Sequence, residues 1–138
     1  ELEKAHRIIE LRAYDTVYGI WKYFTVADEH IDLATQNYLY IVTLEGYEKM
    51  RSYFGADKVV PIYIEVEDGQ RLMRAIERER RQGTPKYEEM CRRFLADAAD
   101  FSEEKLKKAG VEIRFVNEDF DTTVQEVASY IRNDIAAD

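Results

Sequence analysis

The pattern of apolar and polar positions predicts two strands that are apolar on both faces, YLYIVTL (38–44) and VVPIYIEV (59–66). Short β-branched and aromatic runs of this kind are typical of strands inside a covered parallel sheet. Between them, apolar residues recur at helical spacing over 44–55, and Gly55 follows where helices commonly end. The stretch 38–66 therefore predicts a strand–helix–strand unit with a right-handed connection.

The rest of the chain predicts further helices and a third short strand. The expected elements are helices over 68–82, 86–108 and 121–134, a strand over 113–117, and a strand as one option for 21–26 in a small mixed subdomain. Gly83-Thr84-Pro85 separates the first two helices, and Asp121 is the expected N-cap of the last. The fold class is therefore α/β with a parallel sheet, in which ligands bind beyond the carboxyl ends of the strands.

Length, composition and charge narrow the class of protein. A chain of 138 residues with 46% apolar and 35% charged residues is expected to form one globular domain. Its net charge of −8 argues against general nucleic-acid binding, which depends on neutralising phosphates. We find no sequence long enough to span a membrane and no signal peptide, so a cytoplasmic location is the simplest expectation.

One segment departs from this acidic balance. Residues 71–93 contain seven arginines, one lysine and four glutamates, a local charge of +4 that leaves −12 on the remainder of the chain. The arginines are Arg71, Arg74, Arg78, Arg80, Arg81, Arg92 and Arg93. Those at 71, 74, 78 and 81 are spaced to share one helix face.

Two explanations of this segment remain open from the pattern alone. The first is a solvated helix face with local ion pairs, each worth at most about 1 kcal/mol. The second is a lid in which Arg74 and Arg78 converge with the pair Arg92-Arg93 from the far side of the Gly83-Thr84-Pro85 break. Arginine rather than lysine favours the second, because the planar guanidinium binds oxyanions through two parallel hydrogen bonds.

Taken together, the motifs and their order resemble the guanylate kinase family, P-loop kinases that transfer a phosphoryl group from ATP to GMP. The resemblance spans residues 8–131. It rests on Val116-Asn117-Glu118-Asp119 before an amphipathic helix, on the Arg74-x-x-x-Arg78 pair directly after a strand, and on the later pair Arg92-Arg93.

The resemblance implies a fold and its parts. It implies the parallel sheet of a P-loop kinase, incomplete because its first strand and phosphate loop are absent, with a remnant of the GMP-binding subdomain and a helical lid. Within a single domain over 1–138, the implied parts are a GMP-binding part over about 1–36, a core over 37–67 and 111–138, and the arginine-rich lid with its following helix over 68–110.

The resemblance also assigns site residues. Arg74, Arg78 and Arg93 would be catalytic lid arginines on the phosphates; Arg74 and Asn117 would lie on the ATP side; Glu10, Tyr18 and Thr43 would form the GMP site. Glu10 would read guanine, and the hydroxyl of Tyr18 would contact the GMP phosphate. Alternatives remain for two of them: Asn117 as a turn residue that caps the last helix, and Tyr18 as an ordinary core aromatic.

Several positions depart from the family pattern. Ile20 replaces a usual threonine or serine, while Ile41 and Thr43 stand where acidic residues near the metal are common. The chain contains no G-x-x-x-x-G-K-[ST] loop, which in this chemistry holds ATP and its Mg²⁺. We therefore expect a C-terminal portion of a kinase that cannot hold ATP in the ordinary way and has negligible activity alone, with Mg²⁺ and ATP as the cofactors of the complete enzyme.

Partners follow from the same interpretation. The expected ligands are GMP and ATP, with no nucleic acid and no membrane. Self-association is also expected, because a sheet that lacks its first strand exposes an edge. The competing hypothesis is an inactive guanylate-kinase-like module that binds a protein or phosphopeptide, and a third is an α/β domain whose arginines only decorate a helix.

Overall fold

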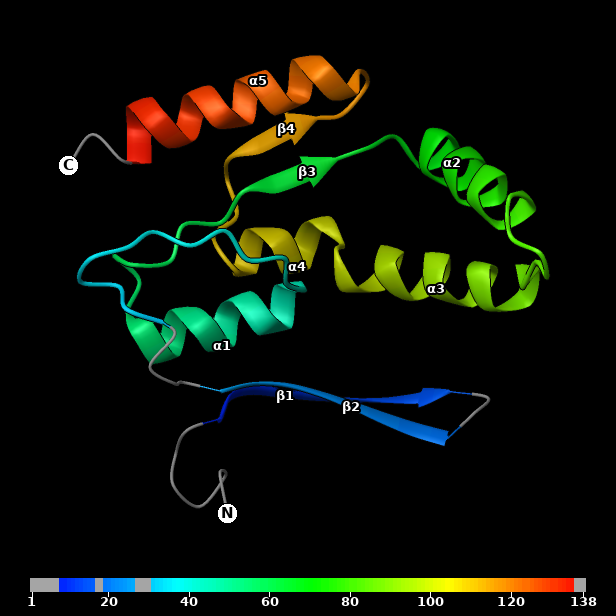
Figure 1. Cartoon of the computed structure of the whole chain (residues 1–138), viewed down its shortest axis with the longest axis horizontal. Coiled ribbons are helices and arrows are strands. Elements are labelled where there is room, and N and C mark those ends of the chain that lie inside the picture. The colour runs from blue at the N-terminus through cyan, green and yellow to red at the C-terminus, as the bar shows by residue number, and fades with distance from the viewer. Residues whose placement is uncertain (1–7, 17–18, 27–30, 136–138) are drawn as a thin grey trace. The chain divides into compact units, whose positions relative to one another are not determined.

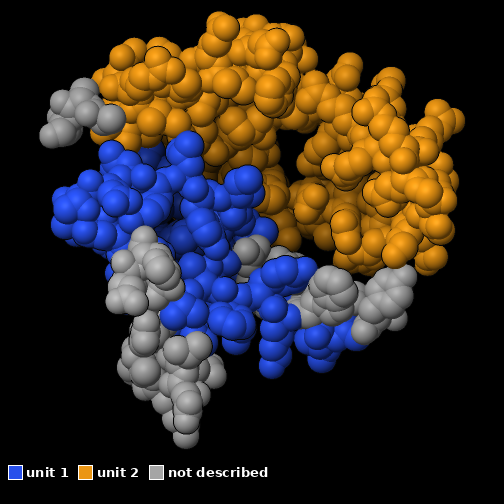
Figure 2. Space-filling model, in the orientation of Figure 1, with its two compact units in different colours: residues 1–60 blue, residues 61–138 orange. Residues whose placement is uncertain are grey.

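The computed structural model describes residues 8–16, 19–26 and 31–135 (Figure 1). It is a mixed α/β protein that divides into two compact units, residues 1–60 and 61–138 (Figure 2). The boundary between the units falls inside the stretch 37–67, which we expected to be one part of the core.

The first unit is a β-hairpin with one helix. Its elements are β1 (Ile8–Thr16), β2 (Gly19–Val26) and α1 (Leu44–Phe54). The strands pair antiparallel with Thr16 opposite Gly19, so a strand at 21–26 is confirmed. The helix buries Leu44, Tyr47 and Met50, which with Ile9 form the apolar core of this unit.

Local chemistry sets both ends of α1. The hydroxyl of Thr43 accepts a hydrogen bond from the main-chain N–H of Gly46 at 3.4 Å and caps the first turn. At the other end Gly55 has φ 102°, and its N–H donates to the carbonyl of Arg51 at 3.0 Å. Only glycine adopts such a φ without strain, so the predicted helix end at Gly55 is confirmed.

The predicted strand at 38–44 is wrong. Residues 36–43 have no regular secondary structure, and Leu39 and Ile41 are 81% and 100% exposed. A strand exists only through hydrogen bonds to a neighbouring strand, and none of the described residues pairs with this stretch. The strand–helix–strand unit expected over 38–66 is therefore absent from the described structure, although its sequence has strong β propensity.

The second unit contains the parallel sheet. Its elements are β3 (Tyr63–Glu65), α2 (Asp68–Arg80), α3 (Tyr87–Asp100), α4 (Glu103–Lys108), β4 (Arg114–Val116), α5 (Phe120–Tyr130) and the π-helical turn η1 (Ile131–Ile135). The strands β3 and β4 pair in parallel with Tyr63 opposite Arg114. The parallel pairing is as predicted, but within the described ranges this sheet has two short strands.

The single helix expected over 86–108 is also wrong, because the chain breaks between α3 and α4. At the break Ser102 is extended, with φ −63° and ψ 149°. The break lets the Phe101 ring stack on Tyr63 of β3 at 5.9 Å between ring centres, while α4 buries Leu106 to 1% exposure. Tertiary packing thus decides where this helix ends.

The last helix begins at Phe120, one residue before the predicted range, and its N-cap lies two residues before the predicted one. Its N-cap is Asp119, whose carboxylate accepts from the N–H of Thr122 at 2.9 Å and from its hydroxyl at 2.7 Å. Asp121, which we expected as the cap, already lies in the first turn. None of the described helices is both long and apolar enough to cross a membrane.

Candidate phosphate-binding cleft

The helices α2 and α3 are the two arms of a helical hairpin (Figure 1). Side chains of both arms line a cleft of about 610 Å³. We call it the α2–α3 cleft. Five lining side chains are cationic: Arg71, Arg74, Arg78, Lys86 and Arg93. Three are acidic: Glu79, Glu89 and Asp97. The cleft therefore carries a net positive charge in a chain whose total charge is −8.

The first arm is positioned by its N-cap. The carboxylate of Glu67 accepts from the N–H groups of Gly69 and Gln70, both at 2.9 Å, and these hydrogen bonds lower the pKa of Glu67. From this start the spacing of three and four residues directs the first three arginines of α2 into the cleft. Arg81, which we expected on the same face, is the C-cap residue of α2 and is not among the lining residues.

Arg74 joins the cleft to the end of the parallel sheet. Its Nη2 donates to the main-chain carbonyls of Asn117 at 3.0 Å and Glu118 at 3.2 Å, just after β4. Arg74 and Asn117, which the resemblance placed together on the ATP side, are therefore adjacent. Asn117 does not cap the last helix, because Asp119 occupies that position. The main-chain N–H of Asn117 instead donates to the main-chain carbonyl of Glu65 at 2.8 Å.

Arg78 and Arg71 differ in how their charge is used. Arg78 lines the cleft and forms no hydrogen bond or ion pair with any residue that the structure describes. Arg71 instead lies 4.4 Å from the centre of the Phe94 ring and 3.3 Å from the carboxylate of Asp68. Arg71 therefore contributes to packing between the arms, whereas the charge of Arg78 is uncompensated.

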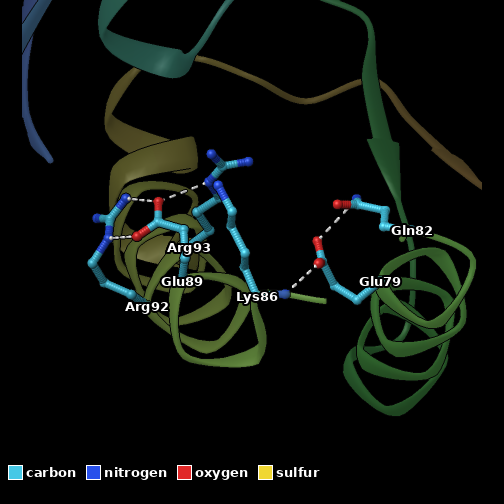
Figure 3. Close-up of polar contacts among 6 residues, drawn as sticks. All are labelled: Glu79, Gln82, Lys86, Glu89, Arg92 and Arg93. Atoms are coloured by element: carbon cyan, nitrogen blue, oxygen red, sulfur yellow. Dashed lines mark hydrogen bonds and ion pairs between the residues drawn. The ribbon is translucent and has the colours of Figure 1, made fainter. Parts of the chain in front are cut away.

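The second arm carries a cluster around Glu89 (Figure 3). Its carboxylate accepts from Nε and Nη2 of Arg92, both at 2.8 Å, and from Nε of Arg93 at 3.0 Å. These hydrogen bonds lower the pKa of Glu89 from 4.5 to about 2. Arg93 lines the cleft and Arg92 is not among its lining residues, so only one member of the predicted pair is placed there.

Glu79 connects the two arms, and sequence reasoning missed it. This residue is 9% exposed, and its carboxylate accepts from the main-chain N–H of Lys86 at 3.0 Å and from Nε2 of Gln82 at 3.3 Å (Figure 3). A glutamate in the last turn of a helix is disfavoured by the helix dipole. That misplaced charge is the one sequence signal that marked Glu79 as a residue with a tertiary partner.

The residues assigned to GMP belong to the first unit. Glu10 on β1 is 3% exposed, and its carboxylate lies so close to Gly46 that a Cβ there would overlap it. Thr43 caps α1, and Tyr18 lies outside the described residues. A hollow of about 480 Å³ along α1 has neither Glu10 nor Thr43 among its lining residues. Recognition of guanine by this group stays a prediction.

Comparisons of this chain with models of protein families, with curated proteins and with solved structures find no match. Several of the residues predicted from the sequence line the α2–α3 cleft together: Arg74, Arg78 and Arg93.

Proposed function

We propose that the α2–α3 cleft binds the phosphate groups of a nucleotide and that the chain is a guanylate-kinase-like protein. The observation that carries the proposal is that Arg74, Arg78 and Arg93, which come from two helices, line one cleft. A solvated helix face would not require Arg93 of α3 to line the same cleft as Arg74 and Arg78 of α2.

The charges in the cleft favour an oxyanion. Arg78 has no partner among the described residues, and Arg74 is bonded only to neutral carbonyls, so neither charge is neutralised by a carboxylate. A guanidinium binds a phosphate through two parallel, charge-assisted hydrogen bonds, which are stronger than neutral ones. An incoming phosphate would therefore meet two positive charges that no side chain has already satisfied.

The proposed role in catalysis is stabilisation of charge. Phosphoryl transfer from ATP to GMP spreads negative charge over the transferred group, and positioned arginines stabilise that charge in the transition state. The chain contains no G-x-x-x-x-G-K-[ST] loop, so we expect negligible turnover from these 138 residues alone. No described cluster of three or more His, Cys, Asp or Glu could hold a metal ion, and we assign these residues no step that involves Mg²⁺.

The test is a calorimetric titration of the chain with ATP, GMP and tripolyphosphate. We expect Arg78→Ala to weaken the binding of ATP and tripolyphosphate by roughly tenfold or more, the size of one charge-assisted hydrogen bond. Arg80→Ala is the matched control, because Arg80 is exposed on the same helix and does not line the cleft. Equal affinities for wild type, Arg78→Ala and Arg74→Ala would mean that the arginines only decorate α2.

A second candidate is supported by the burial of Glu10. Because Glu10 as a whole is 3% exposed, its carboxylate offers no open edge to a guanine base in the structure described. An inactive module that binds a phosphopeptide through the same arginines needs no guanine site. Protection against thermal unfolding by a phosphopeptide but not by GMP would favour this second candidate. A ligand at a hundredfold its Kd adds about 2.7 kcal/mol to the free energy of unfolding.

A further inference from the structure

Two adjacent arginines on α3 share one carboxylate in different ways (Figure 3). Arg92 binds Glu89 through both Nε and Nη2 at 2.8 Å, which is a bidentate pair. Arg93 binds the same carboxylate through Nε alone, at 3.0 Å. The carboxylate therefore binds two nitrogens of the Arg92 guanidinium and only one nitrogen of the Arg93 guanidinium.

The two arginines also differ in their position relative to the α2–α3 cleft, and this position decides which guanidinium can reach a ligand there. In Arg93 both terminal nitrogens have no hydrogen-bond partner in the part of the chain that the structure describes, and the side chain lines the α2–α3 cleft. In Arg92 both Nε and Nη2 are already used by Glu89, and the side chain is not among the residues that line the cleft. The terminal nitrogens of Arg93 can thus bind two oxygens of a phosphate while Nε stays on Glu89.

We propose that Glu89 is a positioning residue that selects Arg93, rather than Arg92, as the cation of α3 that contacts phosphate. The proposal rests on the proposed function of the cleft. The Arg93 side chain is 68% exposed, so without an anchor it would sample many rotamers. The bond to Glu89 fixes the guanidinium of Arg93 before a ligand arrives. The entropy lost in ordering this side chain therefore does not weaken the binding of the ligand.

Glu89 could also repel an anionic ligand. Positioning and repulsion predict changes of opposite sign in the phosphate affinity when the carboxylate is replaced. If repulsion dominates, replacing the carboxylate by a neutral amide strengthens phosphate binding. If positioning dominates, the same replacement weakens it. Positioning is favoured because the bidentate pair with Arg92 already balances the charge of Glu89.

The experiment is a calorimetric titration with tripolyphosphate, which has no base or sugar to confuse the readout. We expect Glu89→Gln to bind about three- to tenfold more weakly than wild type, the size expected when one more long side chain must be ordered on binding. Arg93→Ala should lose at least as much, and Glu89→Gln should cost nothing further in the Arg93→Ala background. Arg92→Ala should lose less than Arg93→Ala, because it removes the charge that balances Glu89 but no phosphate contact.

A second measurement reads the positioning without a ligand. In the nitrogen-15 spectrum of the wild type, the Nε–H group of Arg93 should be rigid and slow to exchange with water, and Glu89→Gln should make it mobile. Tighter tripolyphosphate binding by Glu89→Gln, additive losses in the double variant, or a mobile Nε–H in the wild type would overturn the proposal. Absence of tripolyphosphate binding by the wild type would instead remove the proposed function, and the role of Glu89 with it.

Discussion

Arg74 donates a hydrogen bond from Nη2 to the main-chain carbonyl of Asn117 at 3.0 Å, across 43 residues of sequence. The bond fixes α2 to the segment that follows β4, so one wall of the α2–α3 cleft is attached to the parallel sheet. Arg74 therefore has a structural partner in the absence of any ligand, whereas Arg78, one turn further along the helix, has none among the described residues.

This contrast predicts that replacing Arg74 lowers the stability of the fold, whereas replacing Arg78 affects ligand binding and leaves stability almost unchanged. Arg74→Ala should lower the free energy of unfolding by about 1 kcal/mol, because it removes hydrogen bonds from a charged donor at a partly solvated site. Arg78→Ala should change it by less than about 0.5 kcal/mol, the range of ordinary surface substitutions. Urea unfolding followed by circular dichroism measures both; equal losses would contradict the assignment.

The cluster around Glu89 predicts a titration far from that of an ordinary glutamate. Hydrogen bonds from Arg92 and Arg93 hold the folded-state pKa of Glu89 at about 2, below the 4.5 of an unperturbed side chain. Because the folded-state pKa is depressed, the ion pair stabilises the fold fully above about pH 4.5, and this contribution is lost as the pH falls towards 2.

Carbon-13 NMR of the Glu89 carboxyl group gives the check. At pH 3.5 the group should still be ionised in the wild type, and in Arg92→Ala its midpoint should rise towards the ordinary value. A wild-type midpoint near 4.5 would show that the pair with Arg92 does not persist in solution.

The N-cap of α5 gives a test with a neighbouring control. Asp119→Ala removes the acceptor for both the N–H and the hydroxyl of Thr122 and should cost about 1 kcal/mol of stability. Asp121→Ala, two residues along, removes only a first-turn charge and should cost less than about half as much. Thermal unfolding of the two variants should rank them in that order, and the reverse order would restore Asp121 as the cap.

Two glycines in first turns of helices should respond differently to replacement by alanine. A Cβ at Gly46 would overlap the Glu10 carboxylate and the Val42 side chain, so Gly46→Ala should destabilise the chain by about 1–3 kcal/mol. A Cβ at Gly69 would meet only the end of Glu67, at 3.0 Å, and alanine has the better helix propensity, so Gly69→Ala should be close to neutral. Chemical denaturation compares them; a neutral Gly46→Ala would show that β1 and α1 do not pack as described.

Local signals predicted much of the fold. The apolar spacing over 44–55, the glycine at 55 and the break at Gly83-Thr84-Pro85 all correspond to helix ends in the structure. These features depend on hydrogen bonds and side chains within a few residues of one another. For the same reason the spacing of Arg71, Arg74 and Arg78 predicted their common helix face.

The errors concern contacts between distant residues. The run 38–44 has the composition of a buried strand, yet no described strand pairs with it, and α3 ends at Asp100 rather than continuing. Strand pairing and the stacking of Phe101 on Tyr63 depend on which segments lie close together in space. A single sequence carries little information about such tertiary contacts.

By itself, the amino-acid sequence determined the apolar face of α1, the common face of Arg71, Arg74 and Arg78 on α2, most of the helix ends and the gathering of guanidinium groups in an acidic chain, because these follow from local periodicity and local hydrogen bonding. Only the tertiary structure decided that Arg93 rather than Arg92 lines the cleft, that Glu79 joins its two arms, and that Arg74 meets Asn117. Each of those outcomes depends on a partner that the packing of separate elements brings close. Residue spacing along the chain does not encode the distance in space between residues of different elements.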